Sequence, residues 1–300
     1  MSTRRYGPYS FEASNGEKVF FPDAGITKEE LIEYYDKIAK TMLPYLKERP
    51  VAMQRFPNGI EGEGFYQKQV PGYFPDWIER QSVTKEEGRV SHVIINNVAT
   101  LAYLANQGCI TPHVWLSRRD KLHYPDRLIL DLDPTDEDFS KVRNAALQSR
   151  TLFKELDLPV YVMTTGSRGL HLLVPLDRSQ SFDRVRDFAQ RLVEELAARH
   201  PDELTSAMRK KDRGNRVYLD VTSNAYGQHA VAPYAVRPRS SAPVATPLDW
   251  DEVCDSSLTA DKYTISSIFR RLAQIDEPWL RMQKHAVSFR AAQKTLNQET

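Results

Sequence analysis

Cysteine is scarce in this 300-residue sequence, which contains only Cys109 and Cys254. The two residues are far apart and fit no CxxC pattern, so the sequence predicts neither a disulfide framework nor a cysteine-rich zinc site. Two ordinary reduced thiols are typical of a cytoplasmic protein.

Long apolar segments are also missing. No apolar run approaches the length needed to span a bilayer. Residues 1–16 are polar and lack the hydrophobic centre of a secretory signal. We therefore expect a cytoplasmic protein that has no membrane partner.

Charge of one sign is not in excess. The chain has 41 Lys+Arg and 40 Asp+Glu, which gives a formal net charge of +1. A protein that coats nucleic acid or an anionic membrane by bulk charge is strongly basic, so this balance argues against that class. A local basic groove stays open, because net charge does not say where the charges lie. The 41% of hydrophobic residues supplies a core, and the length suggests one large or two small domains.

Helical and strand patterns alternate along the chain. Thr27 and Glu30 form a capping-box pattern ahead of helical spacing that reaches Leu46, with Pro44 as a kink or an early end. Further helices are predicted over 92–106, 140–156 and 182–200. Strands are predicted over 51–56, 114–117, 127–133, 159–164, 170–174, 216–221 and 230–236. This mixture predicts an α/β (α+β) protein. We expect a single domain over 1–300, with its main body at about 10–236, a surface crossing at 237–250 and a helical segment at 251–300.

The strand predicted over 127–133 ends in two aspartates. Because side chains alternate along a strand, Asp131 and Asp133 share one face and three leucines share the other. Paired carboxylates are ligands for hard divalent cations, and two such ions clamp the oxygens of a phosphoryl displacement. A polar strand end facing solvent is the competing interpretation, because so short a motif recurs by chance.

Asp220 lies in an apolar strand, where an unpaired acid is costly. Asp220 is either a third metal ligand or the partner of a nearby arginine in a salt bridge, and both interpretations remain open.

Gly166 and Gly169 permit a tight turn between two strands. Ser167 and Arg168 in this turn add hydrogen-bond donors for a phosphate, although a plain hairpin is equally consistent. The basic run 209–216 suggests either a solvated loop or a polyanion contact.

These pieces, in this order, resemble the polymerase domain of the bacterial multifunctional DNA ligase D, a branch of the archaeo-eukaryotic primase superfamily. The resemblance covers about residues 10–290. The matching positions are Asn15–Lys18, Arg49–Pro50, Arg55–Gly59, Phe65–Tyr66, Pro75–Trp77, His113, Asp131–Pro134, Gly166–His171, Asp220 and Ala232–Arg237.

The resemblance implies a primase-type fold, in which an RRM-like catalytic sheet packs with a second α/β unit and flanking helices. It implies a metal triad of Asp131, Asp133 and Asp220 that holds two Mn²⁺ or Mg²⁺ ions, with Asp220 helping to activate the primer 3′-hydroxyl. Triphosphate contacts are implied for His113, Thr165, Ser167, Arg168, His171 and Arg237. Phe65 and Tyr66 are implied as the platform for the incoming base and sugar, although core filling is the more common fate of such residues.

The resemblance also implies partners. Asn15, Lys18 and Lys28 are implied to form part of a pocket for a 5′-phosphate on the downstream DNA strand, and Arg213 is implied to contact the template. Arg55 is expected as a further DNA contact that compensates for the glutamine at position 54. The expected substrates are NTPs or dNTPs and gapped or recessed DNA ends. The expected partners are a DNA ligase and a Ku-type end-binding protein at the nucleoid. Ribonucleotides and manganese are preferred in the family.

This chain departs from the family pattern at three positions. Arg168 stands where many members have Lys, Gln54 where a phosphate-contacting Lys is frequent, and Tyr66 where Phe is frequent. The change at Gln54 weakens the expected 5′-phosphate pocket.

Three other functions compete with template-directed nucleotidyl transfer in break repair. The run Asp131–Thr135 also resembles the DxDxT motif of haloacid-dehalogenase-type phosphatases, in which the first aspartate ends the first strand of a Rossmann-like domain. A standalone primase of the same superfamily and a non-catalytic DNA-end bridging module are the others.

Overall fold

The computed structural model describes residues 2–84 and 88–297, and the chain in it alternates between two units. The first unit consists of 1–120, 229–245 and 263–274, and the second of 121–228, 246–262 and 275–300. Each unit contains its own six-stranded sheet. The expectation of a single domain over 1–300 stays a prediction.

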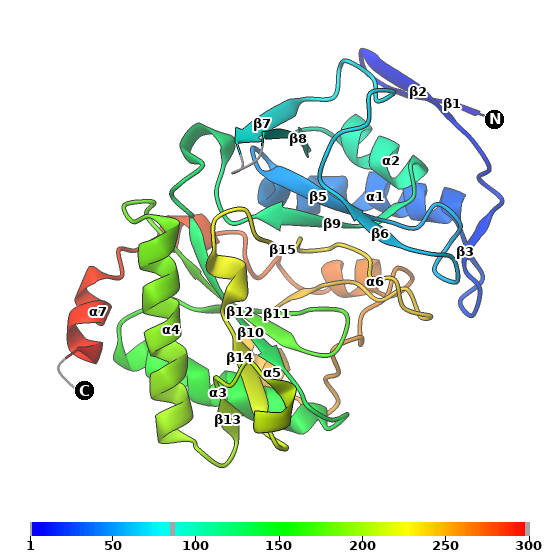
Figure 1. Ribbon diagram of the computed structural model, residues 1–300. Coiled ribbons are helices and arrows are strands. Elements are labelled where there is room, and N and C mark those ends of the chain that lie inside the picture. The colour runs from blue at the N-terminus through cyan, green and yellow to red at the C-terminus, as the bar shows by residue number, and fades with distance from the viewer. Residues whose placement is uncertain (1, 85–87, 298–300) are drawn as a thin grey trace. The chain divides into compact units, whose positions relative to one another are not determined.

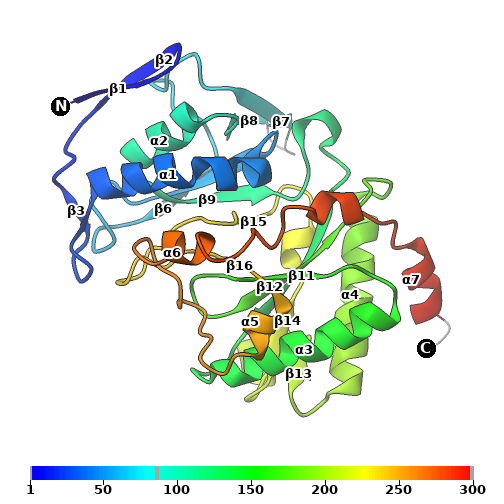
Figure 2. The ribbon, with the colours of Figure 1, turned by 180° about the vertical axis from the view of Figure 1, so that it is seen from behind.

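The first unit is built around a sheet with strand order β15-β9-β5-β8-β7, in which β6 also pairs with β5. Figures 1 and 2 show helices α1 and α2 side by side along one face of this sheet. Its elements are β1 (Ser2–Tyr6), β2 (Tyr9–Ala13), β3 (Val19–Phe21), β4 (Ile26–Thr27), α1 (Lys28–Leu46), β5 (Pro50–Arg55), β6 (Phe65–Gln67), β7 (Arg80–Thr84), β8 (Arg89–Ile94), α2 (Val98–Asn106), β9 (Cys109–Trp115), β15 (His229–Val231) and α6 (Ile268–Leu272).

The capping box predicted at the start of α1 is confirmed. The Thr27 side chain accepts a hydrogen bond from the Glu30 amide, and the Glu30 carboxylate accepts one from the Thr27 amide. Pro44 lies inside the helix, which continues to Leu46. The apolar stripe of α1 is buried, and Tyr35 on it donates a hydrogen bond to the carbonyl of Ile110 in β9. This stripe fixes the helix against the sheet.

The second unit has the order β-α-β-β-α-β, formed by β10, α3, β11, β12, α4 and β14, with the four strands arranged β14-β10-β12-β11. This arrangement confirms the expected RRM-like sheet. The elements are β10 (Arg127–Asp133), α3 (Phe139–Glu155), β11 (Tyr161–Thr164), β12 (Leu170–Pro175), α4 (Phe182–Arg199), β13 (Leu204–Thr205), β14 (Val217–Asp220), β16 (Pro247–Leu248), α5 (Trp250–Cys254) and α7 (Arg290–Leu296).

The two long helices of this unit, α3 and α4, pack against its sheet. Helices α3 and α4 contact each other and both contact β10. Leu128, Leu130 and Leu132 are fully buried, whereas Asp131 and Asp133 in the alternate positions are half-buried. Because side chains alternate in a strand, the aspartates lie on the face opposite the leucines.

Several predicted segments differ from the structure. The strand predicted over 114–117 is β9, which begins at Cys109 and ends at Trp115, and the strand predicted over 230–236 is β15, which ends at Val231. The helix predicted over 92–106 begins only at Val98, because residues 89–94, rich in β-branched side chains, form β8 and pair with β7 and β5. The surface crossing predicted over 237–250 is wrong for 242–248, which are buried. Val244 bridges to Val236, and β16 pairs with β11, so this Pro- and Ala-rich stretch serves as short strand segments.

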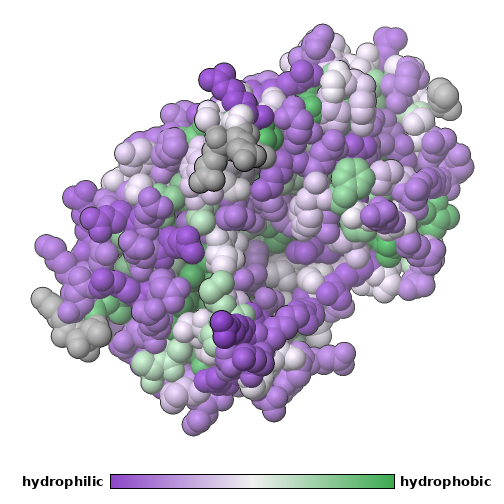
Figure 3. Space-filling view, viewed as in Figure 1, coloured by the Kyte–Doolittle hydropathy of each residue, from purple (hydrophilic) through white to green (hydrophobic). Residues whose placement is uncertain are grey.

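On the face seen in Figure 3, hydrophilic residues dominate and apolar residues form small separate patches. Across residues 2–84 and 88–297, we find no helix with the length and apolar character needed to cross a bilayer.

Candidate active site

Three strands of the second unit place acidic and imidazole side chains in one row. Asp131 in the central strand β10 is directly opposite Asp220 in β14 on one side and His171 in β12 on the other. Opposite residues of antiparallel strands have Cβ atoms about 4.5–5.5 Å apart. Asp133 follows two positions along β10. We call Asp131, Asp133, Asp220 and His171 the acid row.

The contacts within the acid row leave negative charge uncompensated. His171 Nε2 lies 3.4 Å from Asp131 Oδ2, and the His171 ring is buried. Asp220 Oδ1 accepts a hydrogen bond from the Thr222 amide at 2.7 Å. Asp131 Oδ1, in contrast, is buried and has no hydrogen-bond partner within the described part of the chain. A buried carboxylate oxygen without a donor is rare in folded proteins and marks a site for an external group.

The raised pKa of Asp133 is a second sign of excess negative charge in the acid row. Burial is the largest cause that raises this pKa, to about 6, and the neighbouring carboxylates of Asp131 and Asp220 raise it further. The guanidinium groups of Arg168 and Arg213 act in the opposite direction. Like charges at short range disfavour ionisation of both groups. A cation bound here would relieve the repulsion.

The chemistry of the acid row suits hard divalent cations, which prefer carboxylate oxygens. Among the residues that the structure describes, no three His, Cys, Asp or Glu side chains are grouped tightly enough to hold one metal ion together. The fit therefore rests on the unpartnered Asp131 Oδ1 and on the raised pKa of Asp133.

A tight turn lies beside the acid row. Thr165 is buried, and its Oγ1 accepts hydrogen bonds from the amides of Ser167 and Gly169 at 3.3 and 3.2 Å. Gly166 has a φ of 65°. A Cβ atom on Gly169 would lie 2.2 Å from the carbonyl oxygen of Leu132, so only glycine permits this approach of β12 to β10. The turn thereby holds exposed Arg168 close enough to influence Asp133.

Arg213 is held by its own loop. Its Nε and Nη2 donate to the carbonyls of Ala207 and Met208, and its guanidinium carbon lies 3.6 Å from the centroid of the Tyr218 ring. Tyr218 is opposite Asp133 in the sheet. The basic run 209–216 therefore borders the acid row; the template contact implied for Arg213 stays a prediction.

The candidate nucleotide contacts of the first unit gather around Tyr66. Tyr66 is 53% exposed, and the centroid of its ring lies 5.2 Å from that of His113 and 5.7 Å from that of His229. Burial raises the pKa of the Tyr66 hydroxyl, and nearby Arg237 opposes that shift. An exposed ring beside a guanidinium suits a stacked base that carries phosphates.

Phe65 lies on the other face of the same strand. Arg55 is opposite Phe65 in the sheet and places its guanidinium carbon 5.6 Å from the Phe65 ring centroid. Arg55 is buried and donates hydrogen bonds to Gln67, Tyr73 and the carbonyl of Gln107. Phe65 and Tyr66 are consecutive in β6, so they point to opposite faces and do not form one continuous shelf. These contacts give Arg55 a structural role and do not support the DNA contact predicted for it.

Lys18 and Lys28 bring two ammonium groups together at the start of α1. Lys28 is buried and donates to the carbonyl of Ser14 at 2.6 Å, while Lys18 donates to Asn58 Oδ1 at the same distance. Burial lowers the pKa of Lys28, and the charge on Lys18 lowers it further. Two close ammonium groups favour an anion between them. The 5′-phosphate contact stays a prediction.

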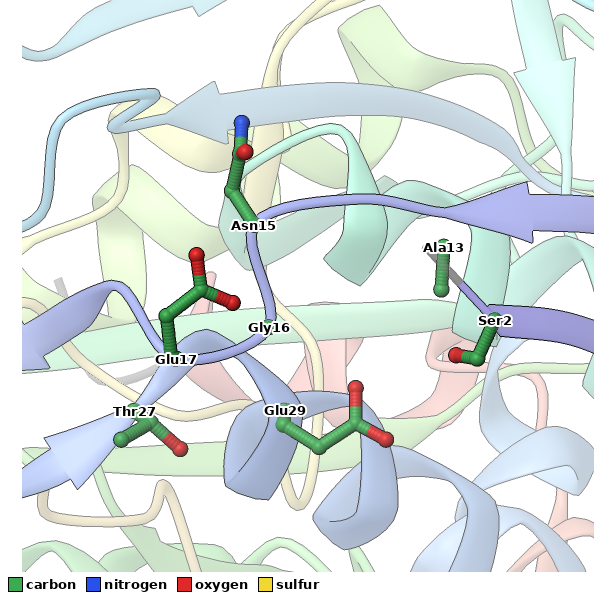
Figure 4. A pocket seen from close by; sticks show the side chains of 7 residues that line it. All are labelled: Ser2, Ala13, Asn15, Gly16, Glu17, Thr27 and Glu29. Carbon is green, nitrogen blue, oxygen red and sulfur yellow. The ribbon is translucent and has the colours of Figure 1, made fainter.

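Asn15, the third member of the predicted phosphate pocket, lines a cavity of about 410 Å³ on the same unit. The other lining residues are Ser2, Ala13, Gly16, Glu17, Thr27 and Glu29. Figure 4 shows the Asn15 amide pointing away from the carboxylates of Glu17 and Glu29. Because two acids line this cavity, it does not suit a phosphate, and neither lysine lines it.

Sequence reasoning did not single out His229, which contacts both Tyr66 and His113. The strand predicted over 230–236 begins one residue after His229, and only the pairing of Val231 with His113 brings His229 to the His113 ring. That pairing joins segments more than a hundred residues apart, and the sequence pattern alone does not reveal it.

Comparisons with known proteins match the chain closely. The family model described as "LigD, primase-polymerase domain" matches residues 27–279. The chain is 36% identical over 248 residues to the multifunctional non-homologous end joining protein LigD of Mycolicibacterium smegmatis. The aligned region covers 82% of this chain and 32% of that protein. The chain is 33% identical over 269 residues to the Pseudomonas aeruginosa protein of the same name, which covers 89% and 32%.

A solved structure extends the match to three dimensions. The polymerase domain of Mycobacterium tuberculosis Ligase D, solved in complex with DNA, superposes with a TM-score of 0.86 at 29% identity, and the match covers 92% of this chain and 99% of that domain. The chain spans about a third of the length of the curated relatives named above. On the family match and this fold, the chain belongs to the LigD primase-polymerase domain family.

Proposed function

We propose that this chain is a template-directed nucleotidyl transferase that adds NTPs or dNTPs to DNA 3′-ends at breaks or gaps, as a step of non-homologous end joining. The observation that carries the proposal is the acid row, in which Asp131 lies between Asp220 and His171 and keeps a buried oxygen without a donor. The names of the LigD relatives and the DNA-bound solved structure support the setting.

In the proposed mechanism, Asp131, Asp133 and Asp220 hold two Mn²⁺ or Mg²⁺ ions. Such ions, when bound, supply Lewis-acid stabilisation of the attacking and leaving oxygens in phosphoryl transfer. Asp220 helps to activate the primer 3′-hydroxyl as a nucleophile. His171, 3.4 Å from Asp131, orients that carboxylate.

Other side chains position the substrate in this proposal. Ser167 and Arg168 in the glycine turn bind triphosphate oxygens, and Arg168 is the exposed member that extends from the turn. In the first unit, Tyr66 stacks the base while His113 and Arg237 contact the nucleotide phosphates. A DNA ligase and a Ku-type protein are the proposed partners, at the nucleoid in the cytoplasm.

The phosphatase interpretation of Asp131–Thr135 is wrong. That class requires a Rossmann-like parallel sheet with the first aspartate at the end of its first strand. Here β10 is antiparallel to both β12 and β14.

Primer extension on gapped DNA tests the proposal. ATP and dATP are each supplied with Mn²⁺ or Mg²⁺, on gaps with and without a downstream 5′-phosphate. We expect one or a few additions, supported better by Mn²⁺ and by ATP, and stimulated by the phosphate. Asp131→Ala and Asp220→Ala are expected to abolish incorporation and keep DNA binding.

Three outcomes would change the assignment. Full incorporation by either alanine variant would refute the role of the acid row. Absence of any effect of the phosphate would refute the Lys18–Lys28 site. Dinucleotide synthesis without a primer on single-stranded DNA would favour a standalone primase, and end bridging without incorporation would favour the non-catalytic module.

A further inference from the structure

The face of the first sheet that carries Tyr66 has a defined set of neighbours. Gln54 is opposite Tyr66 across β5 and β6, and Ala52, two residues earlier in β5, is opposite His113 in β9. His113 is in turn opposite Val231 in β15, with His229 two residues earlier. Because residues two apart in a strand share a face, Gln54, Tyr66, His113 and His229 belong to the same side of the sheet. We call these four residues the Tyr66 face.

Three rings, those of Tyr66, His113 and His229, gather on this face. The His113 and His229 centroids are 5.3 Å apart at an interplanar angle of 68°. Tyr66 inclines at 66° to His113 and 31° to His229, and half of its surface remains exposed. Both histidines therefore contact the Tyr66 ring.

Two polar atoms on this face are buried without a partner. Neither Gln54 Oε1 nor His229 Nδ1 has a hydrogen bond within residues 2–84 and 88–297. A buried polar atom that makes no hydrogen bond costs about 1–3 kcal/mol, so such atoms are few in folded proteins and call for an explanation. Here both occur beside one exposed ring.

His229 is held neutral. Burial lowers its pKa to about 4, and the charges of Lys68 and His92 lower it further. A neutral imidazole carries one N–H and one lone pair. An unsatisfied lone pair is tolerated better than an unsatisfied N–H, so the tautomer with the proton on Nε2 is favoured and Nδ1 is an acceptor. Gln54 Oε1 is an acceptor as well.

We propose that Gln54 and His229 determine specificity by accepting hydrogen bonds from donor groups of the nucleotide that stacks on Tyr66. This inference rests on the proposed function and adds which chemical feature of the substrate is recognised: an O–H or N–H donor next to a flat ring. A ribose hydroxyl and the amino group of a base both supply such a donor.

Equilibrium binding of three nucleotides to the full chain, with gapped DNA and Mn²⁺, separates the two donor sources. ATP carries both donors, dATP lacks the 2′-hydroxyl, and purine ribonucleoside triphosphate lacks the amino group. The variants are Gln54→Met and His229→Leu. Gln81→Met is the matched control, because Gln81 lies in β7 and donates to the carbonyl of Ser82.

We expect each variant to bind ATP about 3- to 10-fold more weakly than the wild type and to lose no affinity for the one analogue that lacks its donor. His229→Gln keeps an acceptor and should recover part of the discrimination. In single-turnover incorporation the loss should appear in the apparent nucleotide affinity, with the maximal rate kept.

Equal losses for all three nucleotides would show a packing role and overturn the inference, as would unchanged discrimination in both variants. Failure of the wild type to bind any nucleotide would instead overturn the proposed function on which the inference rests.

Discussion

The acid row and the Tyr66 face are built in the same way and differ in the chemistry of the side chains that they bring together. Each lies on one face of a sheet, where antiparallel pairing places side chains together from three strands in the acid row and from four strands in the Tyr66 face. The second unit brings like charges together, and burial followed by the neighbouring carboxylates raises the pKa of Asp133. The first unit collects rings and neutral acceptors, and it lowers the pKa of His229. We propose that the acid row binds a cation and that the Tyr66 face binds a flat ligand with hydrogen-bond donors.

The acid row differs most from the Tyr66 face in the close approach of strands β10 and β12, which a glycine permits. Gly169→Ala places a Cβ 2.2 Å from the carbonyl oxygen of Leu132, so β10 and β12 must separate. We expect incorporation to fall about 100-fold, since displacements of about 1 Å have that effect in active sites. The melting temperature should fall as well. Gly72→Ala is the control, because a Cβ there meets no atom within 4 Å. A fully active Gly169→Ala would show that this spacing is unimportant.

The Tyr66 face should depend on its ring. Tyr66→Ala is expected to lower kcat/KM for the nucleotide about 10- to 100-fold, because stacking of one base contributes about 1–3 kcal/mol. Tyr66→Phe keeps the ring and should remain within about 2-fold of the wild type. Phe65→Ala gives the sharper comparison, since Phe65 lies on the opposite face. If it raised KM for the nucleotide as much as Tyr66→Ala, the separation of the two rings would be contradicted.

Acid should destabilise the Tyr66 face. The pKa of His229 is near its ordinary value of 6.5 in the unfolded chain and about 4 when folded. Between pH 6.5 and pH 4, His229 is therefore protonated in the unfolded state and neutral in the folded state. The free energy of unfolding consequently decreases as pH falls from 6.5 towards 4. His229→Leu should remove about 1–2 kcal/mol of this loss between pH 7.5 and pH 5. Thermal melts of both proteins at the two pH values measure it; an identical pH dependence would refute the shift.

The acid row should respond to pH in the opposite direction. The folded pKa of Asp133, about 6, exceeds its ordinary value of 3.8, so its charge destabilises the fold fully above pH 6 and progressively less as pH falls from 6 to 4. In EDTA at pH 7.5, Asp133→Asn should raise stability by about 1 kcal/mol after allowance for solvent screening, or about 2–4 °C in Tm. The gain should shrink at pH 5. Mn²⁺ should then stabilise the wild type more than the variant.

Local patterns predicted much of this molecule. The capping box at Thr27 and the β10 strand ending in Asp131 and Asp133 depend on neighbouring residues only, and both lie where the sequence indicates. Pairing between distant segments was less accessible. The strand at 89–94 exists because β7 and β5 flank it, and residues 242–248 are buried because they pair with Val236 and β11. Strand register also separates Phe65 from Tyr66.

The alternation of the chain between the two units has a consequence for synthesis on the ribosome. The edge strand β15 of the first sheet begins at His229, and the edge strand β16 of the second begins at Pro247. Neither sheet can be completed until these late residues have left the exit tunnel, although most of each unit is made earlier. Both sheets therefore gain these edge strands only after residue 228 has been synthesised. A chain cut after residue 228 would leave two sheets with open edges, a known template for aggregation.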